Sequence, residues 1–230
     1  MKRLFYFFLM ALMMVPATVS CKKERNPKAK VPVPEAVDLG LSVKWASFNL
    51  GASQPSELGE YFAWGETKTK YYDGYQSNTY QWIKDDKLTK YCPKEDNGYE
   101  GYNDNRVKLE SEDDVAQKLL GGKWRMPTRA ECEELKNLCL WEFDTVDGLD
   151  GVRIYSKDKS TSIFLPATGT LGYNKPTTSQ TYGYYWASTF SLMMPYNGDC
   201  IGFTAGTPVN PNVGILVRYA GLPIRPVYGK

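Results

Sequence analysis

The clearest local signal in this chain is the stretch Gly122-Lys123-Trp124-Arg125-Met126-Pro127-Thr128-Arg129-Ala130-Glu131. Thr128 followed three residues later by Glu131 is a capping box, and Pro127 directly before it marks the turn into a helix. The apolar stripe of that helix is formed by Cys132, Leu135, Leu138 and Cys139. In the other direction, Gly121-Gly122 ends an earlier helix, with Ser111 as its expected N-cap. The apolar face of this earlier helix comprises Val115, Ala116, Leu119 and Leu120.

Short strands surround the two predicted helices. Residues 42–48 alternate and are rich in strand formers, and residues 151–155 and 162–166 form two strands joined by a charged turn. Further strands are predicted at 184–188, 201–203, 214–218 and 224–227. Residues 68–108 show no sustained periodicity, which predicts a long loop region. This order of elements predicts an α+β fold with antiparallel pairing.

Residues 1–20 have the features of an export signal, with a cationic start and an apolar run too short to span a bilayer. The segment Ala17-Thr18-Val19-Ser20-Cys21 resembles the lipobox of bacterial lipoproteins, which implies cleavage before Cys21 and a lipid on its thiol. Ordinary secretion with an incidental cysteine is the alternative. We therefore expect a lipid-anchored protein of the cell envelope, at the outer membrane, with the membrane face left open.

Residues 21–35 are basic and proline-rich, which predicts a flexible tether before a single domain at 36–230. Residues 1–30 carry a net charge of +6 and residues 31–230 one of −4, so the domain offers no basic surface for nucleic acid.

Residue types exclude several kinds of chemistry. The chain has no histidine, which removes Ser–His–Asp triads and histidine metal sites. It has no Cys-x-x-Cys pair, so structural zinc is not expected. Cys132 and Cys139 are predicted to be buried free thiols, whereas a bridge between Cys92 and Cys200 stays open. We expect no cofactor, no metal and no catalytic residue.

Six ordered blocks resemble one known family, the Fibrobacter major paralogous domain of Bacteroidetes-type lipoproteins and surface proteins. The blocks span residues 37–46, 61–67, 122–128, 162–167, 183–188 and 221–227. The resemblance implies a C-type-lectin-like fold in which the first and last strands pair. Two helices would pack on the antiparallel sheet, and a loop-rich region would display the ligand contacts. It assigns no activity, since fold alone does not decide function.

Three interpretations of the site follow. Asn210-Pro211-Asn212 faintly resembles the loop of calcium-dependent lectins, but a plain turn is the simpler interpretation. Residues 125–131 resemble a block of formylglycine-generating enzymes, but those need a reactive cysteine pair near the C-terminus, where this chain has only Cys200. A packing role for Trp124 and an ion pair for Arg125 are more plausible there.

The third interpretation, which we favour, is a non-enzymatic recognition face within residues 184–219 that binds a glycan or protein ligand. Tyrosine offers contact area and small polar residues offer adaptable hydrogen bonds, as in antibody binding sites. This segment also resembles the variable region of diversified lectin-fold proteins. The alternatives are a non-binding structural subunit of a surface assembly and, less favoured, a degenerate relative of formylglycine-generating enzymes. The tryptophans Trp45, Trp64, Trp124 and Trp186 are predicted to be core. The predicted ligand contacts are Tyr184, Tyr196, Asn197, Asp199, Asn210, Asn212 and Tyr219.

The lipid anchor is directly testable. Cys21→Ser removes the only thiol that the lipobox-like segment offers, so the variant is expected in the soluble rather than the membrane fraction. Fractionation of cells followed by immunoblotting measures this. Unchanged membrane fractionation would contradict the anchor.

Overall fold

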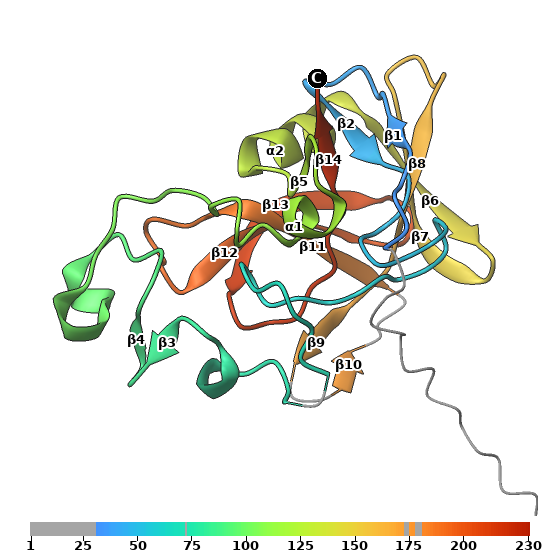
Figure 1. The fold of residues 1–230 in the computed structure, drawn as a ribbon. Coiled ribbons are helices and arrows are strands. Elements are labelled where there is room, and N and C mark those ends of the chain that lie inside the picture. The colour runs from blue at the N-terminus through green and yellow to red at the C-terminus, as the bar shows by residue number, and fades with distance from the viewer. Residues whose placement is uncertain (1–30, 72, 173–174, 178–180) are drawn as a thin grey trace, which may run out of the picture. The chain divides into compact units, whose positions relative to one another are not determined.

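The computed structural model describes residues 31–71, 73–172, 175–177 and 181–230. The expected export signal, Cys21 and the first part of the tether lie outside the described residues. Of the tether, residues 31–35 are described: Pro34 is buried, and Glu35 and Ser47 exchange two hydrogen bonds. The described residues form two α-helices and several sheets whose strands all pair antiparallel, which confirms the α+β class (Figure 1).

A four-stranded sheet joins the beginning and the end of the domain. Its order is β1 (Ala36–Val37), β2 (Val43–Ala46), β14 (Val227–Gly229) and β5 (Trp124–Arg125). The C-terminal strand pairs with β2 rather than with β1, and Val227 lies opposite Trp45. The expected strand at 224–227 begins only at its last residue, because residues 223–226 run toward the interior and Arg225 is buried there.

The second predicted helix is confirmed as α2 (Arg129–Leu138), including the capping box of Thr128 and Glu131. The first, α1 (Val115–Leu120), starts later than expected because Asp114, not Ser111, is its N-cap. The Asp114 carboxylate accepts hydrogen bonds from the backbone of both Gln117 and Met126, which fixes the helix start against β5. Among the described residues, no helix is long and apolar enough to cross a membrane.

The predicted apolar faces of the two helices are only partly buried. Val115 and Ala116 are buried, as are Cys132, Leu135 and Cys139, but Leu119 and Leu138 are exposed. Both exposed leucines lie near helix C-termini, where the neighbouring elements no longer cover the helix surface.

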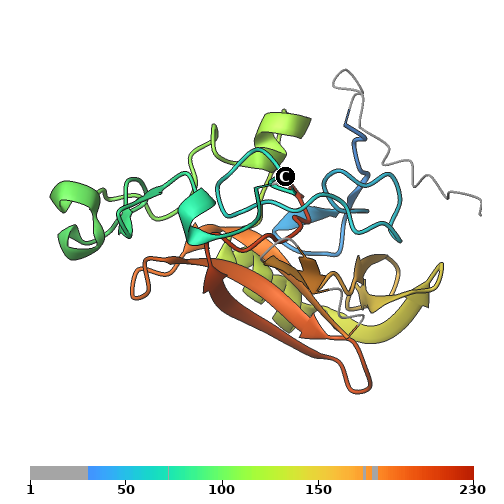
Figure 2. The same ribbon diagram turned by 90° about the horizontal axis from the view of Figure 1, so that it is seen from below.

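Two three-stranded sheets complete the domain. β6 (Leu140–Val146), β7 (Leu149–Tyr155) and β8 (Ser162–Pro166) form one, in which the predicted 151–155 and 162–166 strands pair as expected. β11 (Tyr182–Phe190), β12 (Asn197–Thr204) and β13 (Asn210–Val217) form the other. In Figure 2, α2 lies behind this orange-to-red sheet, against which it packs.

The predicted loop region contains short elements of its own. They are η1 (Ser77–Thr79), β3 (Ile83–Lys84), β4 (Lys87–Leu88), η2 (Glu95–Asn97) and η3 (Tyr99–Gly101). β3, β4 and the short green helices beside them project on the side of the molecule away from β6 and β7 (Figures 1 and 2). The small hairpin of β9 (Thr170–Gly172) and β10 (Lys175–Thr177) precedes β11.

The core confirms the predictions for the large aromatic residues and the thiols. Trp45, Trp64, Trp124 and Trp186 are all buried. The four described cysteines are free and buried, so Cys92 and Cys200 form no bridge.

Arg225 is fully buried and joins three parts of this frame. Its guanidinium donates to Asn49 Oδ1 at 2.8 Å, to the Ala46 carbonyl at 2.9 Å and to the Phe164 carbonyl at 2.7 Å. Burial lowers the pKa of Arg225 to about 10. The side chain therefore remains cationic at neutral pH, held by three oxygen acceptors rather than by a carboxylate.

Arg225→Met should lower the free energy of unfolding by about 3–5 kcal/mol, because it leaves three buried acceptors without a donor. Arg153→Met is the matched control. Its half-buried side chain pairs with Asp144 near the surface, and its loss should cost less than about 1 kcal/mol. Urea unfolding of the purified full-length variants measures both values. Equal losses would show that Arg225 has no special role in the frame.

Candidate functional site

The sheet β11–β12–β13 presents two different faces. Tyr185, Ile201, Phe203 and Val213 point to one side, where they join the core under α2. The alternate residues point to the other side. There Trp186 and Cys200 belong to a second core cluster that also contains Phe62 and Trp64. Further along the strands this second face becomes polar and reaches solvent.

The solvent-reaching part of that face brings together three of the predicted contacts. Tyr184, Gly202 and Asn212 lie directly opposite one another across the three strands, so their side chains share one side of the sheet. Tyr182, Thr204 and Asn210 form the next row on the same side. Asn210, Asn212 and Thr204 are exposed, and both tyrosines are half-buried. We call these five side chains, Tyr182, Tyr184, Thr204, Asn210 and Asn212, the tyrosine–asparagine face.

Gly202 determines the shape of this face. A Cβ at this position would lie 2.6 Å from two atoms of the Tyr184 ring, so the ring lies over the glycine. The rings of Tyr182 and Tyr184 meet edge to face with centroids 5.5 Å apart. The result is an aromatic surface beside the exposed side chains of Asn210 and Asn212.

The expectation that Asn210-Pro211-Asn212 forms a turn is wrong, because the three residues lie within β13. Proline removes a backbone donor, which a strand tolerates where that position faces no partner strand. β13 is the edge strand of its sheet. Its strand geometry puts Asn210 and Asn212 on one side and Pro211 on the other.

Tyr196 ends the β11–β12 connection and Asn197 is the first residue of β12, and both hold the connection in place. The Tyr196 hydroxyl donates to the Asp86 carbonyl at 2.9 Å, which ties this connection to the β3–β4 hairpin. Its own carbonyl accepts from the Arg218 backbone. Asn197 closes the connection through backbone hydrogen bonds to Ser191 and Met194. Both residues thus make contacts within the domain.

Asp199 is buried and paired with α2. Its Oδ1 accepts from Arg129 Nη1 at 2.9 Å, and Arg129 also donates to the Val213 carbonyl. Only 5 % of the Asp199 side chain is exposed. Its carboxylate therefore links the start of α2 to the sheet and is not offered to a ligand.

Tyr219 lies apart from the other predicted contacts. It follows β13 and lines a cavity of about 360 Å³ together with Gln76, Ser77 and Asn78 of the loop region. Sequence reasoning found the tyrosine but not its neighbours, which come from a segment more than a hundred residues away.

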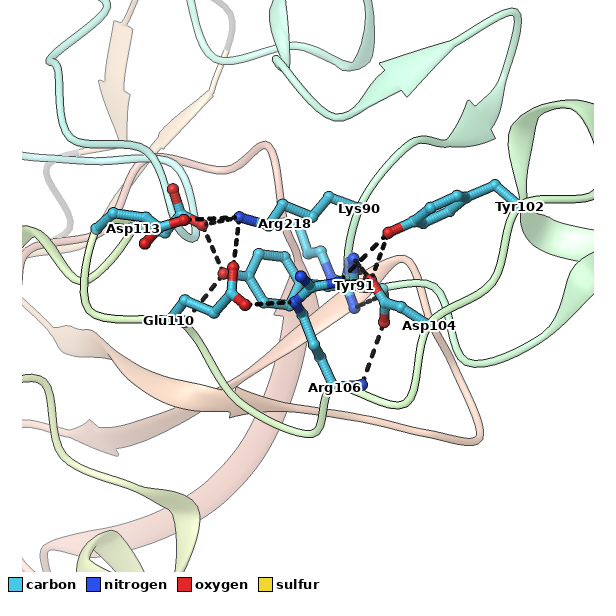
Figure 3. A network of polar contacts seen from close by, with 9 residues as sticks. Lys90, Tyr91, Tyr102, Asp104, Arg106, Glu110, Asp113 and Arg218 are labelled. Carbon is cyan, nitrogen blue, oxygen red and sulfur yellow. Dashed lines mark hydrogen bonds and ion pairs between the residues drawn. The ribbon is translucent and has the colours of Figure 1, made fainter.

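A network of charged and polar residues in the loop region was not predicted. Lys90 Nζ lies 2.7 Å from Glu110 Oε2 and 2.7 Å from Asp113 Oδ2, and 3.6 Å from Glu112 (Figure 3). Burial opposes the charge on Lys90, but its hydrogen bonds to Asp113 and Glu110 prevail and raise its pKa. The three carboxylates are the one group in the described part of the chain with the spacing of metal ligands, and a lysine ammonium already lies among them.

Tyr91 connects this network to the core. Its hydroxyl donates to Asp113 at 2.6 Å and accepts from the Glu110 backbone, while its carbonyl accepts from both terminal nitrogens of Arg218. Arg218 is buried, with its guanidinium 4.6 Å from the Trp64 ring and 4.4 Å from the Phe190 ring. The network in Figure 3 therefore holds the loop region against the aromatic core of the domain.

Comparison of the chain with protein-family models, with curated proteins and with solved structures gives no match.

Asp199→Ala should destabilise the domain by about 1–3 kcal/mol, because it removes a charge-assisted hydrogen bond between α2 and the sheet. Glu133→Ala is the control, since its ion pair with Arg129 is longer at 3.7 Å and more exposed. That variant should lose less than about 1 kcal/mol. Chemical denaturation measures both. An unchanged stability of Asp199→Ala would leave the carboxylate open to a role in binding.

Proposed function

We propose that this protein is a lipid-anchored, non-enzymatic component of the cell envelope whose domain binds a glycan or protein ligand. The observation that carries the proposal is the tyrosine–asparagine face. Tyr184, Asn210 and Asn212, which sequence reasoning selected as contacts, share one side of a rigid sheet and reach solvent. The membrane anchor remains the lipid on Cys21, and no nucleic acid is involved.

The arrangement of elements supports a C-type-lectin-like domain. The last strand pairs with β2, so the chain closes on itself near its two ends. α2 packs on one side of the antiparallel sheet β11–β12–β13, and long irregular segments surround the other. The family resemblance implies such a closure and such helix packing, although the last strand pairs with β2 rather than with β1, and α1 packs on β5.

The chemistry of the face suits recognition. Tyrosine combines an apolar ring with a polar hydroxyl and has few rotatable bonds, so that its ordering costs little entropy. Each asparagine carboxamide both donates and accepts hydrogen bonds. Such a surface binds hydroxyl-rich sugars or the polar backbone of a protein segment.

The thiols support a non-enzymatic role. Burial raises the pKa of Cys139 to about 11 and that of Cys200 to about 12, and it also raises the pKa values of Cys92 and Cys132. Thiols with such pKa values are poor nucleophiles at neutral pH, since the thiolate is the reactive form.

The test compares full-length wild-type protein with a Tyr184→Ala/Asn212→Ala double variant. Wild type should show saturable binding to at least one ligand in a screen of glycans, mucins and intact cell surfaces, with and without calcium. The double variant should bind at least roughly tenfold more weakly, because it loses an aromatic contact and an amide hydrogen bond. Its melting temperature should change little, since one residue is half-buried and the other exposed.

The matched control is Tyr99→Ala/Asn103→Ala, which removes a half-buried tyrosine and an exposed asparagine in the loop region. This variant should bind like wild type. Equal binding by both double variants would show that the tyrosine–asparagine face is not the site. A folded wild-type protein that binds nothing in the screen would contradict ligand binding altogether.

A further inference from the structure

We propose that Tyr219, Gln76, Ser77 and Asn78 form a second binding site that takes one neutral sugar ring. We call it the Tyr219 pocket. Its cavity of about 360 Å³ is near the lower end of the roughly 300–1,000 Å³ that small-ligand sites occupy, which suits one ring rather than a chain. The proposal goes beyond the tyrosine–asparagine face, which lies on β11, β12 and β13 and contains none of these four residues.

The lining of the pocket has the chemistry of a polyol site. Gln76 and Asn78 contribute carboxamides, Ser77 a hydroxyl, and Tyr219 a half-buried ring with a phenol. These groups donate and accept hydrogen bonds without formal charge. Among the described residues, the side chains of Ser77, Asn78 and Tyr219 make no hydrogen bond, so their donors and acceptors are available to a ligand. A sugar offers hydroxyls to such groups and C–H bonds to the ring.

One wall of the pocket is held rigid by the turn in which it lies. The Thr79 hydroxyl donates to the Gly74 carbonyl at 2.8 Å, and the Tyr80 backbone donates to the Ser77 carbonyl. Tyr75 and Tyr80 on either side of η1 are buried. This wall therefore rests on buried aromatic residues, and only the short polar side chains of 76–78 face the cavity.

The opposite wall is held by the core. Tyr219 directly follows Arg218, whose guanidinium is fixed by the Tyr91 carbonyl and two aromatic rings. It precedes Ala220, whose backbone donates to the Val217 carbonyl. Because both walls are already ordered, binding costs little conformational entropy.

The electrostatics favour a neutral ligand. The nearby cation, Lys70, donates to the Thr79 carbonyl and lies 2.6 Å from Glu66 Oε1, so its charge is matched within the protein. In the described part of the lining, an anionic sugar would find no cation and a cationic sugar no carboxylate.

Saturation-transfer NMR on the full-length protein in detergent tests the pocket. The probes are glucose, galactose, mannose and N-acetylglucosamine, with glucuronic acid and glucosamine as charged counterparts. At least one neutral probe should bind, and its charged counterpart should give little signal. Tyr219→Ala and Asn78→Ala should each weaken that binding by roughly tenfold or more, the effect of losing a stacking contact or a hydrogen bond.

Asn103→Ala is the matched control, because it truncates an exposed asparagine of the loop region that belongs to neither proposed site. Binding of the neutral sugar should be unchanged in this variant. Asn78 is exposed, so its variant keeps the test valid even if Tyr219→Ala fails to fold. Binding that survives both pocket variants, equal binding of charged sugars, or no binding of any neutral probe would overturn the proposal. Loss of binding in Asn212→Ala alone would instead assign the sugar to the tyrosine–asparagine face. Failure of that face in its own screen leaves the result for the pocket unaffected.

Discussion

The hydrogen bonds of the buried Arg225 guanidinium are the constraint on which the rest of the structure depends. A buried charge is very costly unless it is fully hydrogen-bonded, so the fold has to bring acceptors to it. Asn49 and Ala46 reach it from the end of β2, and Phe164 reaches it from β8. Three segments far apart in the sequence therefore have one permitted arrangement around this side chain. That arrangement also leads the chain into β14 beside β2.

Arg218 fulfils a similar role for the loop region. Burial lowers its pKa, and it is stabilised by the faces of Trp64 and Phe190 together with the Tyr91 carbonyl. Tyr91 also forms hydrogen bonds to Asp113 and to the Glu110 backbone. Tyr91 therefore connects the Arg218 guanidinium to the network around Lys90. A segment without periodicity can thus be well ordered, since its order comes from polar contacts to the core rather than from regular secondary structure.

The difference between local and long-range contacts explains how much of the structure the sequence predicts. The capping box of Thr128 and Glu131 joins residues three apart, and the 151–155 and 162–166 strands are neighbours in the chain, so local patterns predict both. Asp199 resembled a surface contact because its partner Arg129 is 70 residues away. The Asp114 cap likewise depends on a distant partner, the backbone of Met126 directly after β5. The strand at Asn210 depends on its place at the edge of the sheet. The class of fold and the aromatic core were predictable, whereas the division of polar residues between structural contacts and surface was not.

The division of polar residues between structural contacts and surface also explains the position of the candidate ligand contacts on the sheet. The sheet β11–β12–β13 gives one side to α2 and half of the other to the aromatic core, which leaves only the rows of Tyr184 and Tyr182 for solvent. Short carboxamides and tyrosine rings on so rigid a support lose little entropy when a ligand binds. Tyr219 gains the same advantage from Arg218. Arg225 thus stabilises the frame of the domain. Arg218 stabilises the loop region and also orders the segment that carries Tyr219, part of one of the two polar surfaces on which recognition would depend.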